Sequence, residues 1–459
     1  MRSRLTQPTR RNIELGLILL AWLIGTLGTL IVGWATGEAV PGRFFINAAV
    51  VAVLALGMHI VVRWKASYAD PLMLPVATLL TIIGLVMIYR LDVAAIQRAA
   101  ANGAPTPTPD VFAQLTWFAV ASLLFIAVIL LLHDHRQLQR YTYTLGLVGL
   151  VLLVLPLMPV VGTTVNGATL WVRVGGFTFQ PAEIAKIVLT VFFAGYLVMT
   201  RNSLALIRTK VFGIGLPRAR DLGPILVMWC VSLGILVFER DLGTSLLFFG
   251  LFVSMLYIAT QRRSWLILGG VLFAVGSVLS YLLFAHVRVR VQVWLDPFAY
   301  QADQGYQIVQ SLFGIANGGL FGTGLGQGYP GLVPFANTDF IIAALGEEIG
   351  LIGLMAILLL YAVLIERGLR AAVSIRDPFG QLLSAGLAIT MGLQVFVIVG
   401  GVTRLIPLTG LTTPFLSYGG SSLVANWVIV ALLLRISDRA RRPDPSVSND
   451  APATSEVRA

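Results

Sequence analysis

The segment Ser417-Tyr418-Gly419-Gly420-Ser421-Ser422 runs directly into the apolar stretch LVANWVIVALLLRI, residues 423–436. A helix rises about 1.5 Å per residue, so an apolar run of close to 20 residues can cross the hydrocarbon core of a bilayer. A turn rich in hydroxyls and glycines at the end of such a span indicates a polar site at the membrane edge. The segment therefore predicts a membrane protein with an enzyme-like site.

The composition of the whole chain agrees with a bilayer setting. Of 459 residues, 57% are hydrophobic and 12% are charged, with a mean hydropathy of +0.86. Soluble globular domains carry about 25% charged residues. We therefore predict an all-α polytopic membrane protein with about twelve spans. They begin near Ile13, Phe44, Pro71, Val111, Tyr141, Glu183, Leu222, Leu242, Ser264, Asp339, Gln381 and Ser421.

The charge distribution predicts the orientation. The net charge is +11, and most of the 32 Lys and Arg residues fall in the loops that share a side with both termini. Cytoplasmic loops carry an excess of Lys and Arg, so both termini are predicted to be cytoplasmic. Nucleic-acid binding is the weaker interpretation, because these residues are scattered over short loops and form no single stripe. The single cysteine, Cys230, excludes an intramolecular disulfide framework.

Two long loops on the opposite side carry candidate polar residues. In residues 166–186 apolar and polar residues alternate, and Glu183 and Lys186 stand one helical turn apart. They are interpreted either as a surface pair or as a cavity-facing pair that handles an anionic substrate. The loop of residues 287–339, between spans nine and ten, has glycines at 322, 324, 326 and 328. No strand precedes them, so a dinucleotide loop is disfavoured.

Carboxylates near the span ends form a second group of candidates. Span ten opens on Asp339 and carries Glu347 and Glu348 about two turns deeper, where a charge is costly unless it has a partner or faces a cavity. Pairing with Arg404 or Lys186 is the structural alternative. Asp241, which follows Glu239 and Arg240, is interpreted as a site residue or as the cap of a turn.

Several ordered motifs together resemble the SEDS family of bacterial cell-wall synthesis, which includes RodA, FtsW and their sporulation relatives. The resemblance covers roughly residues 70–437 and favours the RodA-like branch, through the short tail and Arg288-Val289-Arg290. Family members usually have ten spans, so the first two spans resemble an N-terminal addition. The motifs are Asn166-Gly167-Ala168 with Trp171, Gln180-Pro181-Ala182-Glu183 with Lys186, Asp241-Leu242-Gly243-Thr244, Gly305-Tyr306-Gln307 with Gln310-Ser311, Thr338-Asp339-Phe340 with Glu347-Glu348, and Pro414-Phe415 through Ser422.

The resemblance implies a peptidoglycan glycosyltransferase that polymerises lipid II at the outer face of the bacterial cytoplasmic membrane. The family's proposed catalytic acid lies shortly before the glycine of Gly305-Tyr306-Gln307, but the usual spacing falls on Tyr300 in this chain. Asp303 is preferred because it is nearest to Gly305, and Asp296 is the alternative. A second departure is Arg240, where the family commonly has proline.

The other candidate residues are assigned to substrate binding. The arginines and Lys186 could bind a lipid diphosphate. Glu183 could either pair with Lys186 or bind a divalent ion. Membrane anchoring is the alternative for Trp171, and capping of the last helix is the alternative for the hydroxyls of residues 417–421. The set is Trp171, Arg173, Gln180, Glu183, Lys186, Asp241, Thr244, Arg290, Gln307, Gln310, Ser311, Asp339, Glu347, Arg404, Ser417, Tyr418 and Ser421.

The resemblance also implies partners. A class B penicillin-binding protein would supply the crosslinking activity, since no Ser-x-x-Lys motif of a transpeptidase is present, and other elongation or division proteins would join them. A divalent cation, Mg²⁺ or Mn²⁺, is a candidate cofactor, and no organic cofactor is expected.

Two other functions compete with the enzyme. A transporter for lipid II or another lipid-linked sugar would also use many spans and intramembrane acids, but we find no internal repeat, and the polar residues gather at one membrane face. A scaffold would leave the acids and arginines unexplained. The predicted organisation is an N-terminal segment with two extra helices over 1–69, a membrane core over 70–437 and a disordered cytoplasmic tail over 438–459.

Overall fold

The computed structural model describes residues 9–37, 44–159, 161–165, 168–175, 177–205, 209–211, 214–216 and 219–443. Within these residues, eleven helices are long and apolar enough to cross a membrane. The seventh predicted span, which begins near Leu222, corresponds to α7, whose apolar part, Gly223–Phe238, is shorter. The long helices are α1 (Arg11–Ala35), α2 (Phe44–Lys65), α3 (Met73–Ala101), α4 (Asp110–Leu131), α5 (Thr142–Val154), α6 (Pro181–Ala205), α7 (Ala219–Phe238), α8 (Leu242–Thr260), α9 (Ser264–Leu283), α12 (Ile341–Ser374), α13 (Pro378–Val402) and α14 (Gly420–Arg441).

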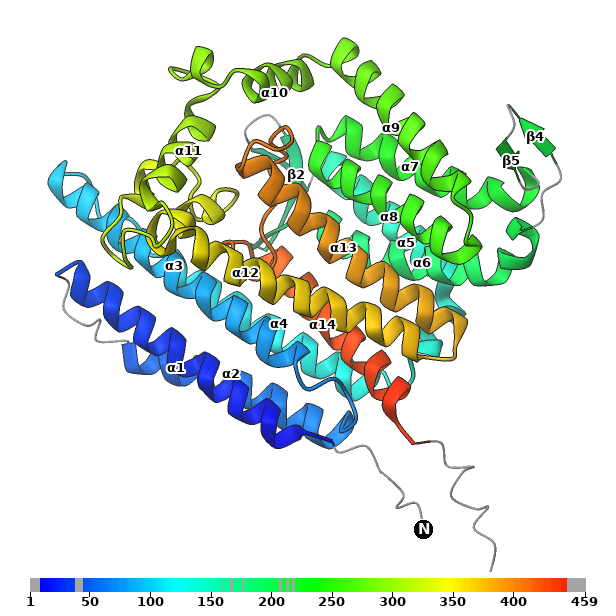
Figure 1. Cartoon of the computed structure of the whole chain (residues 1–459), viewed down its shortest axis with the longest axis horizontal. Helices are drawn as coiled ribbons and strands as arrows, with labels where there is room; N and C mark the ends of the chain where they lie inside the picture. Colours follow the sequence, from blue (N-terminus) through cyan, green and yellow to red (C-terminus); the bar gives the residue numbers. More distant parts are fainter. Residues whose placement is uncertain are drawn as a thin grey trace, which may run out of the picture.

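The helices form one polytopic bundle, as the apolar runs predict (Figure 1). The helices α3, α6, α13 and α14 are mostly buried inside it. The helices α1 and α2 lie on one flank, where α1 packs on α3 and α2 packs on α4. By contrast, α9 buries only Trp265 and Gly269. A span this apolar and this exposed is stable only where lipid or another helix covers it.

Both ends of the described chain lie at the same end of the bundle, as the even number of spans requires (Figure 1). We name this end the terminal face. There Arg11 donates to the Ala69 carbonyl, and the Tyr68 amide donates to Asp438 at 2.9 Å. Helix α14 continues to Arg441 and buries Asp438, so the last helix extends beyond residue 437. Residues 444–459, most of the predicted tail, lie outside the described residues.

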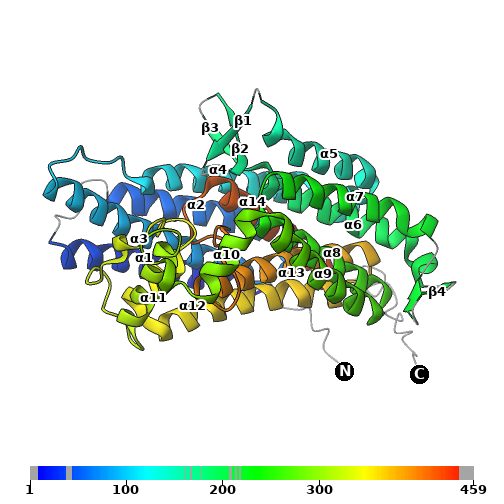
Figure 2. The same ribbon diagram turned by 90° about the horizontal axis from the view of Figure 1, so that it is seen from above.

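The opposite end, which we name the loop face, carries the two long connections. Residues 162–179 form an antiparallel sheet of β1 (Gly162–Val165), β2 (Ala168–Val174) and β3 (Phe177–Phe179), in the order β1-β2-β3 (Figure 2). This small sheet explains the alternating sequence pattern and is an addition to the predicted all-α fold. A hairpin of β4 (Thr209–Val211) and β5 (Ile214–Leu216) connects the other end of α6 to α7, away from the loop face (Figure 1). Asn166 and Gly167 of the first motif lie outside the described residues.

The large loop between α9 and α12 is largely helical. It contains α10 (Ala285–Leu295) and α11 (Tyr306–Gly318), with short 3₁₀ turns at Phe298–Tyr300 and Pro330–Leu332. Two further 3₁₀ turns, His135–Tyr141 and Leu155–Leu157, flank α5. Figure 1 shows α10 lying across the loop face, above the ends of the spanning helices.

The two glutamates of α12 hold this loop. Arg90 of α3 donates to Glu348 at 2.7 Å, and the Gly326 amide donates to the other Glu348 oxygen at 3.0 Å. Glu347 accepts from the Tyr329 amide at 2.8 Å and from Asn317 at 3.2 Å. Both glutamates are buried. The prediction that these glutamates pair with Arg404 or Lys186 was therefore wrong. The hydrogen bonds of Glu347 connect the glycine-rich loop to α12.

Replacing Gly350 by alanine is expected to destabilise this region strongly. Gly350 has φ 68° inside α12, and a Cβ there would lie 2.3 Å from the Gly322 nitrogen. The backbone at this contact cannot move aside without strain, so we expect the free energy of unfolding to fall by about 1–3 kcal/mol or more. The thermal midpoint in detergent checks this. The control is Gly276→Ala on α9, where a Cβ would meet nothing within 4 Å, and equal midpoints for both variants would contradict the expectation.

Candidate functional site

The candidate site centres on a buried lysine at the start of α6. The Lys186 ammonium lies 2.5 Å from Glu183 Oε2 and 2.8 Å from Gln394 Oε1 of α13. All three side chains are buried. Charges at this depth are stable only when they are paired, and Lys186 has a carboxylate and an amide oxygen as acceptors. Of the two interpretations of Glu183 and Lys186, the structure excludes the solvent-exposed surface pair.

Asp241 caps α8 with both of its oxygens. Oδ1 accepts from the Thr244 amide at 2.8 Å, and Oδ2 accepts from the Thr244 hydroxyl at 2.6 Å. The capping interpretation is therefore confirmed, and Thr244 serves the same cap. The preceding residue, Arg240, at the position where the resemblance led us to expect proline, has φ 65°, in the left-handed region.

The backbone of residues 408–412 joins the parts of the site. Arg290 of α10 donates to the Leu408 and Thr409 carbonyls at 3.2 and 3.1 Å. Gln394 donates to the Thr412 carbonyl at 3.0 Å. A Cβ on Gly410 would lie 3.7 Å from Asp339 Oδ2, so this carboxylate faces the same segment. We name Glu183, Lys186, Asp241, Arg290, Asp339 and Gln394 the polar cluster.

Burial controls the ionisation of the acids at the loop face. It raises the pKa of Asp339 to about 6, against the opposing charge of Arg290. Burial also raises the pKa of Asp241, while its hydrogen bonds to Thr244 and the charge of Arg290 lower it. The pKa of the buried Glu239 rises to about 8, through burial and the nearby Asp241. The loop face therefore has two acids, Asp339 in the polar cluster and Glu239 next to Arg240, whose pKa values are raised toward or above neutral pH.

The hydroxyls of residues 417–421 tie four segments together. Ser417 Oγ donates to the Thr338 carbonyl at 2.5 Å and accepts from the Thr413 amide at 2.9 Å. Ser421 Oγ accepts from the Gln180 amide at 2.9 Å, next to the start of α6. The N-cap of α14 is Gly419, with no side-chain cap bond. The predicted alternative, capping of the last helix by these hydroxyls, was therefore wrong.

Burial and the charges of Asp110 and Asp92 raise the pKa of Tyr418 above its ordinary value, so its hydroxyl keeps its proton at neutral pH. Its backbone amide donates to the Asn337 carbonyl at 2.7 Å. Tyr418 therefore lies between the turn and the segment that leads to Asp339.

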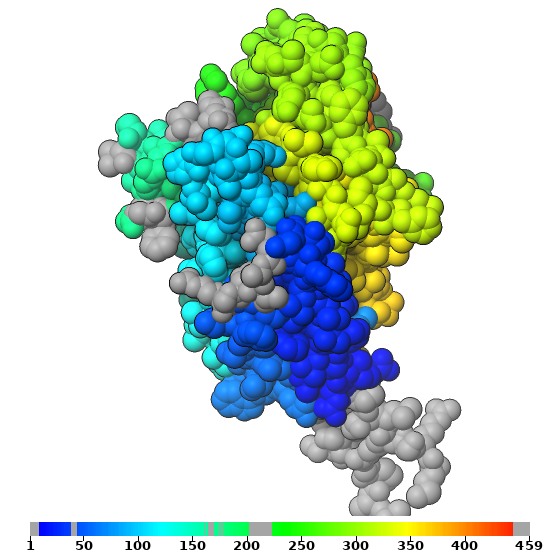
Figure 3. Space-filling model, turned by 90° about the vertical axis from the view of Figure 1, so that its left-hand side faces the viewer, coloured from blue at the N-terminus to red at the C-terminus, as the bar shows by residue number. Residues whose placement is uncertain are grey.

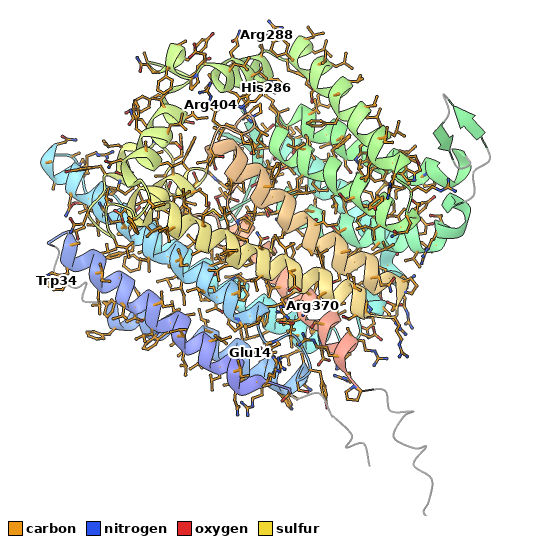
Figure 4. The ribbon with its side chains drawn as sticks, in the orientation of Figure 1. Glu14, Trp34, His286, Arg288, Arg370 and Arg404 are labelled. Atoms are coloured by element: carbon orange, nitrogen blue, oxygen red, sulfur yellow. The ribbon has the colours of Figure 1, made fainter. Side chains whose placement is uncertain are left out.

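Arg404 and Trp294 join α10 to the loop after α13. Arg404 Nε donates to the Trp294 carbonyl at 2.7 Å, and its second nitrogen donates to the Leu295 carbonyl. The Trp294 ring nitrogen donates back to the Arg404 carbonyl at 3.1 Å. Figure 4 labels Arg404 at the loop face, together with His286 and Arg288 of α10. We name this reciprocal contact the α10 clasp, and it directly precedes Asp296.

The two candidate bases lie on the surface after the clasp. Asp296 and Asp303 are both exposed. Asp296 accepts from the Ala299 amide at 3.2 Å, whereas the Asp303 carboxylate has no hydrogen-bond partner among the described residues. Neither forms an ion pair with the polar cluster in the described part of the chain.

The remaining candidates lie around the cluster. Trp171 and Arg173 are on β2, half-buried and exposed respectively, and Arg173 makes no side-chain ion pair with a described residue. On α11, Gln307 and Gln310 are half-buried, and the buried Ser311 hydroxyl has no partner within the described chain. The structure therefore does not bring these residues into direct contact with Lys186.

Sequence reasoning missed Gln394 and Arg90. Gln394 is a lone amide inside an apolar span, a signal that could have been noticed. The partner of Gln394 could not have been predicted, because Lys186 lies 208 residues away in the chain. Arg90, an arginine within the predicted span that begins near Pro71, is a signal of the same kind, and its partner Glu348 lies 258 residues away.

Comparisons with known proteins agree on one family. The chain is 50% identical over 437 residues to the peptidoglycan glycosyltransferase RodA of Mycobacterium bovis and to that of Mycobacterium tuberculosis, covering 95% of this chain and 92% of each relative. It is 35% identical over 379 residues to the probable peptidoglycan glycosyltransferase FtsW of Geobacter metallireducens, covering 81% of this chain and 95% of that protein. The predicted similarity to the RodA branch is confirmed.

Solved structures show the same fold. A chain of a peptidoglycan synthase complex that coordinates polymerization and crosslinking superposes with a TM-score of 0.56, at 25% identity over 87% of this chain and 98% of that chain. RodA of Thermus thermophilus superposes with a TM-score of 0.54, at 24% identity over 83% of this chain and 100% of that one. The profile of the cell cycle protein family FtsW/RodA/SpoVE matches residues 70–442, and the chain therefore belongs to this family.

Proposed function

We propose that this chain is a peptidoglycan glycosyltransferase that polymerises lipid II. The observation that carries the proposal is the polar cluster, which gathers two cations and three carboxylates at the loop face, below a helical loop with exposed aspartates. RodA relatives at 50% identity carry the same activity in their names. The loop face is then the outer face of the cytoplasmic membrane, and the terminal face is cytoplasmic.

The reaction needs a base and a place for a diphosphate. A sugar hydroxyl attacks the anomeric carbon of a lipid-linked sugar, loses its proton and displaces the lipid diphosphate. Asp303 is the proposed base, because its exposed carboxylate is free to accept that proton. Asp296 is the alternative, although its oxygen already accepts a local amide. Arg290 and Lys186 are the proposed contacts for the diphosphate, by paired hydrogen bonds and as a point charge respectively.

A divalent cation, Mg²⁺ or Mn²⁺, remains part of the proposal. Among the described residues, no group of three or more His, Cys, Asp and Glu side chains could hold a metal ion. Mg²⁺ commonly binds through one or two carboxylates and the phosphates of a substrate. Asp339 fits this mode, since it makes no hydrogen bond with a described residue. The cation would supply positive charge at the departing diphosphate.

The function is tested by polymerisation of purified lipid II by this protein and a class B penicillin-binding protein. Such a partner is proposed because the similar solved chain belongs to a synthase complex. We also predict that this partner contacts the chain through membrane helices, and that other elongation or division proteins join the complex. No nucleic-acid partner is expected. Glycan strands made by wild type support the enzyme. Transfer of lipid II across vesicles without polymerisation would instead support the transporter.

Replacing Arg404 by alanine is expected to loosen the α10 clasp. The variant loses two charge-assisted bonds to the carbonyls of residues 294 and 295, and kcat/KM is expected to fall about 10- to 100-fold. Hydrogen exchange should accelerate in α10. The control is Arg288→Ala, since Arg288 is exposed and donates only to the nearby Leu282 carbonyl at 3.0 Å. Lower activity with unchanged exchange in α10 would instead make Arg404 a direct substrate contact.

Activity is expected to fall as the pH drops through about 6, where Asp339 takes up a proton. The protonated form no longer balances Arg290 or binds a cation. Because burial raises this pKa above its ordinary 3.8, protonation favours the folded chain in the window between about 6 and 3.8, so unfolding through this group does not explain the loss. The check is a measurement of kcat/KM from pH 5 to 8. The Asp339→Asn variant is expected to have a low kcat/KM that does not fall further near pH 6. A rate unchanged between pH 8 and pH 5 would contradict the role of Asp339.

A further inference from the structure

The two N-terminal helices line a partly open cavity together with the core. Helix α1 packs on α3, α3 on α4, α4 on α2, and α2 on α1, so the four helices form a closed ring. A cavity of about 280 Å³ lies within the ring and is lined by all four helices. Figure 3 shows α1 and α2, in blue, as one flank of the molecule beside the lighter blue helices. Ligand sites in helical bundles are commonly built between facing helices in this way.

Close packing between α1 and α3 keeps the cavity open. A Cβ on Gly25 would lie 1.9 Å from Ile82 Cγ2, and one on Gly28 would lie 3.3 Å from Val86. At the terminal face, Arg11 and Glu14 form a buried ion pair at 2.5 Å, and Glu14 also contacts His59 of α2 at 2.7 Å. Figure 4 shows Glu14 and Trp34 at opposite ends of α1. The helix pair is thus held by close packing against α3 and by buried polar contacts at the terminal face.

Apart from Asn47, the polar groups in the cavity wall have partners of their own. The Trp22 ring nitrogen donates to the Ala48 carbonyl at 2.9 Å, and the Thr26 and Thr29 hydroxyls donate to carbonyls of their own helix at 2.8 and 2.9 Å. The oxygens of Asp92 accept from the Asp110 and Val111 amides, each at 2.9 Å. An apolar cavity of roughly 150 Å³ already stays free of water in another protein and binds benzene. The wall of this cavity therefore suits a hydrocarbon chain.

The position of the cavity along the helices matches one leaflet. Its wall on α3 extends from Ile82 to Ile96, a rise of about 20 Å toward the loop face. On α2 the wall begins at the first residue, Phe44, and at the start of α4 it includes Pro109 and Val111. Half of a typical hydrocarbon core is about 15 Å. The cavity thus runs from the loop-face ends of the helices to about the middle of the span.

One polar group near this end is available to a ligand. The Asn47 amide lines the cavity and makes no hydrogen bond with any described residue. We propose that this cavity binds one hydrocarbon chain of a membrane lipid from the leaflet at the loop face, with the Asn47 amide near the lipid's ester region. The lipid joins the N-terminal helix pair to the core, and its binding does not depend on glycosyl transfer.

The test uses the whole chain in nanodiscs that contain a phosphatidylglycerol with a diazirine in one acyl chain. After photolysis, labelled peptides are identified by mass spectrometry. The cavity is filled by Val51→Phe, and the matched control is Val53→Phe on the same helix, where the side chain is 68% exposed. Wild type and the control are expected to label wall residues of α2, α3 and α4. Val51→Phe should lose at least about fivefold of that labelling, because the ring occupies the space.

A second pair covers the case in which Val51→Phe does not fold. Leu115→Trp fills the cavity from α4, and Leu123→Trp places the same ring at a position that is 64% exposed. The thermal midpoint of each variant reports folding. Equal wall labelling in the filled and control variants would overturn the proposal. Labelling of wild type confined to exposed residues, as for surrounding bilayer lipid, would overturn it as well, without reference to any variant.

Discussion

Replacing Asp303 by asparagine is expected to lower the rate of lipid II polymerisation by about 10²- to 10⁴-fold, the usual contribution of a positioned general base. The carboxylate is exposed and makes no hydrogen bond with a described residue, so its loss removes proton acceptance and leaves the local fold intact. The measurement is the initial rate of glycan formation from purified lipid II in the presence of the partner transpeptidase.

The matched comparison is Asp296→Asn. Its oxygen accepts from the Ala299 amide, so this variant should weaken the turn after the α10 clasp and reduce the rate to a smaller extent. Gln304→Asn, at an exposed neighbouring position, should leave the rate unchanged. Thermal midpoint and partner binding are measured for each variant. A loss confined to Asp296→Asn would transfer the role of base to Asp296, and full activity of both variants would exclude the two aspartates.

Replacing Lys186 by methionine is expected to be the most destabilising single change in the polar cluster. The substitution leaves the Glu183 carboxylate buried without its cation, and breaking a buried pair costs about 3–5 kcal/mol. The activity should also be lost, because the proposed diphosphate contact is removed. The thermal midpoint in detergent and the polymerisation rate are measured together.

Two controls separate stability from activity. The double variant Glu183→Gln/Lys186→Met carries no buried charge at this position, so it should recover much of the stability while remaining inactive. Arg370→Met removes an exposed ion pair with Glu366, at 2.5 Å, and should cost at most about 1 kcal/mol. If Lys186→Met melted like Arg370→Met, the pair would not be a buried element of the fold. Recovery of activity in the double variant would exclude Lys186 as a substrate contact.

Most of the spans could be predicted because the signal is local. An apolar run near 20 residues forms a helix wherever it packs, so the starts near Phe44, Leu242 and Ser264 coincide with the starts of α2, α8 and α9. The cap of α8 was also predictable, since Asp241 and Thr244 are three residues apart. The sheet of residues 162–179 was visible only as an alternating pattern, which does not specify strand pairing.

The polar partners were not predictable, because a charge in an apolar chain shows that a partner is needed and not which one it is. Glu348 pairs with Arg90 across 258 residues, and Lys186 with Gln394 across 208. The α10 clasp links residues 110 apart, and it gave Arg404 a structural contact that no motif indicated.

The amino-acid sequence by itself determined the membrane class, the order of the helices and the family motifs, since these depend on hydrophobic runs and on residues close together in the chain. The tertiary structure alone decided which charges meet in the polar cluster, which loops are clasped over it, and that the N-terminal pair encloses a cavity. The physical reason is that packing of distant helices selects each partner of a buried polar group, and only in the folded bundle is the cost of burying that group offset.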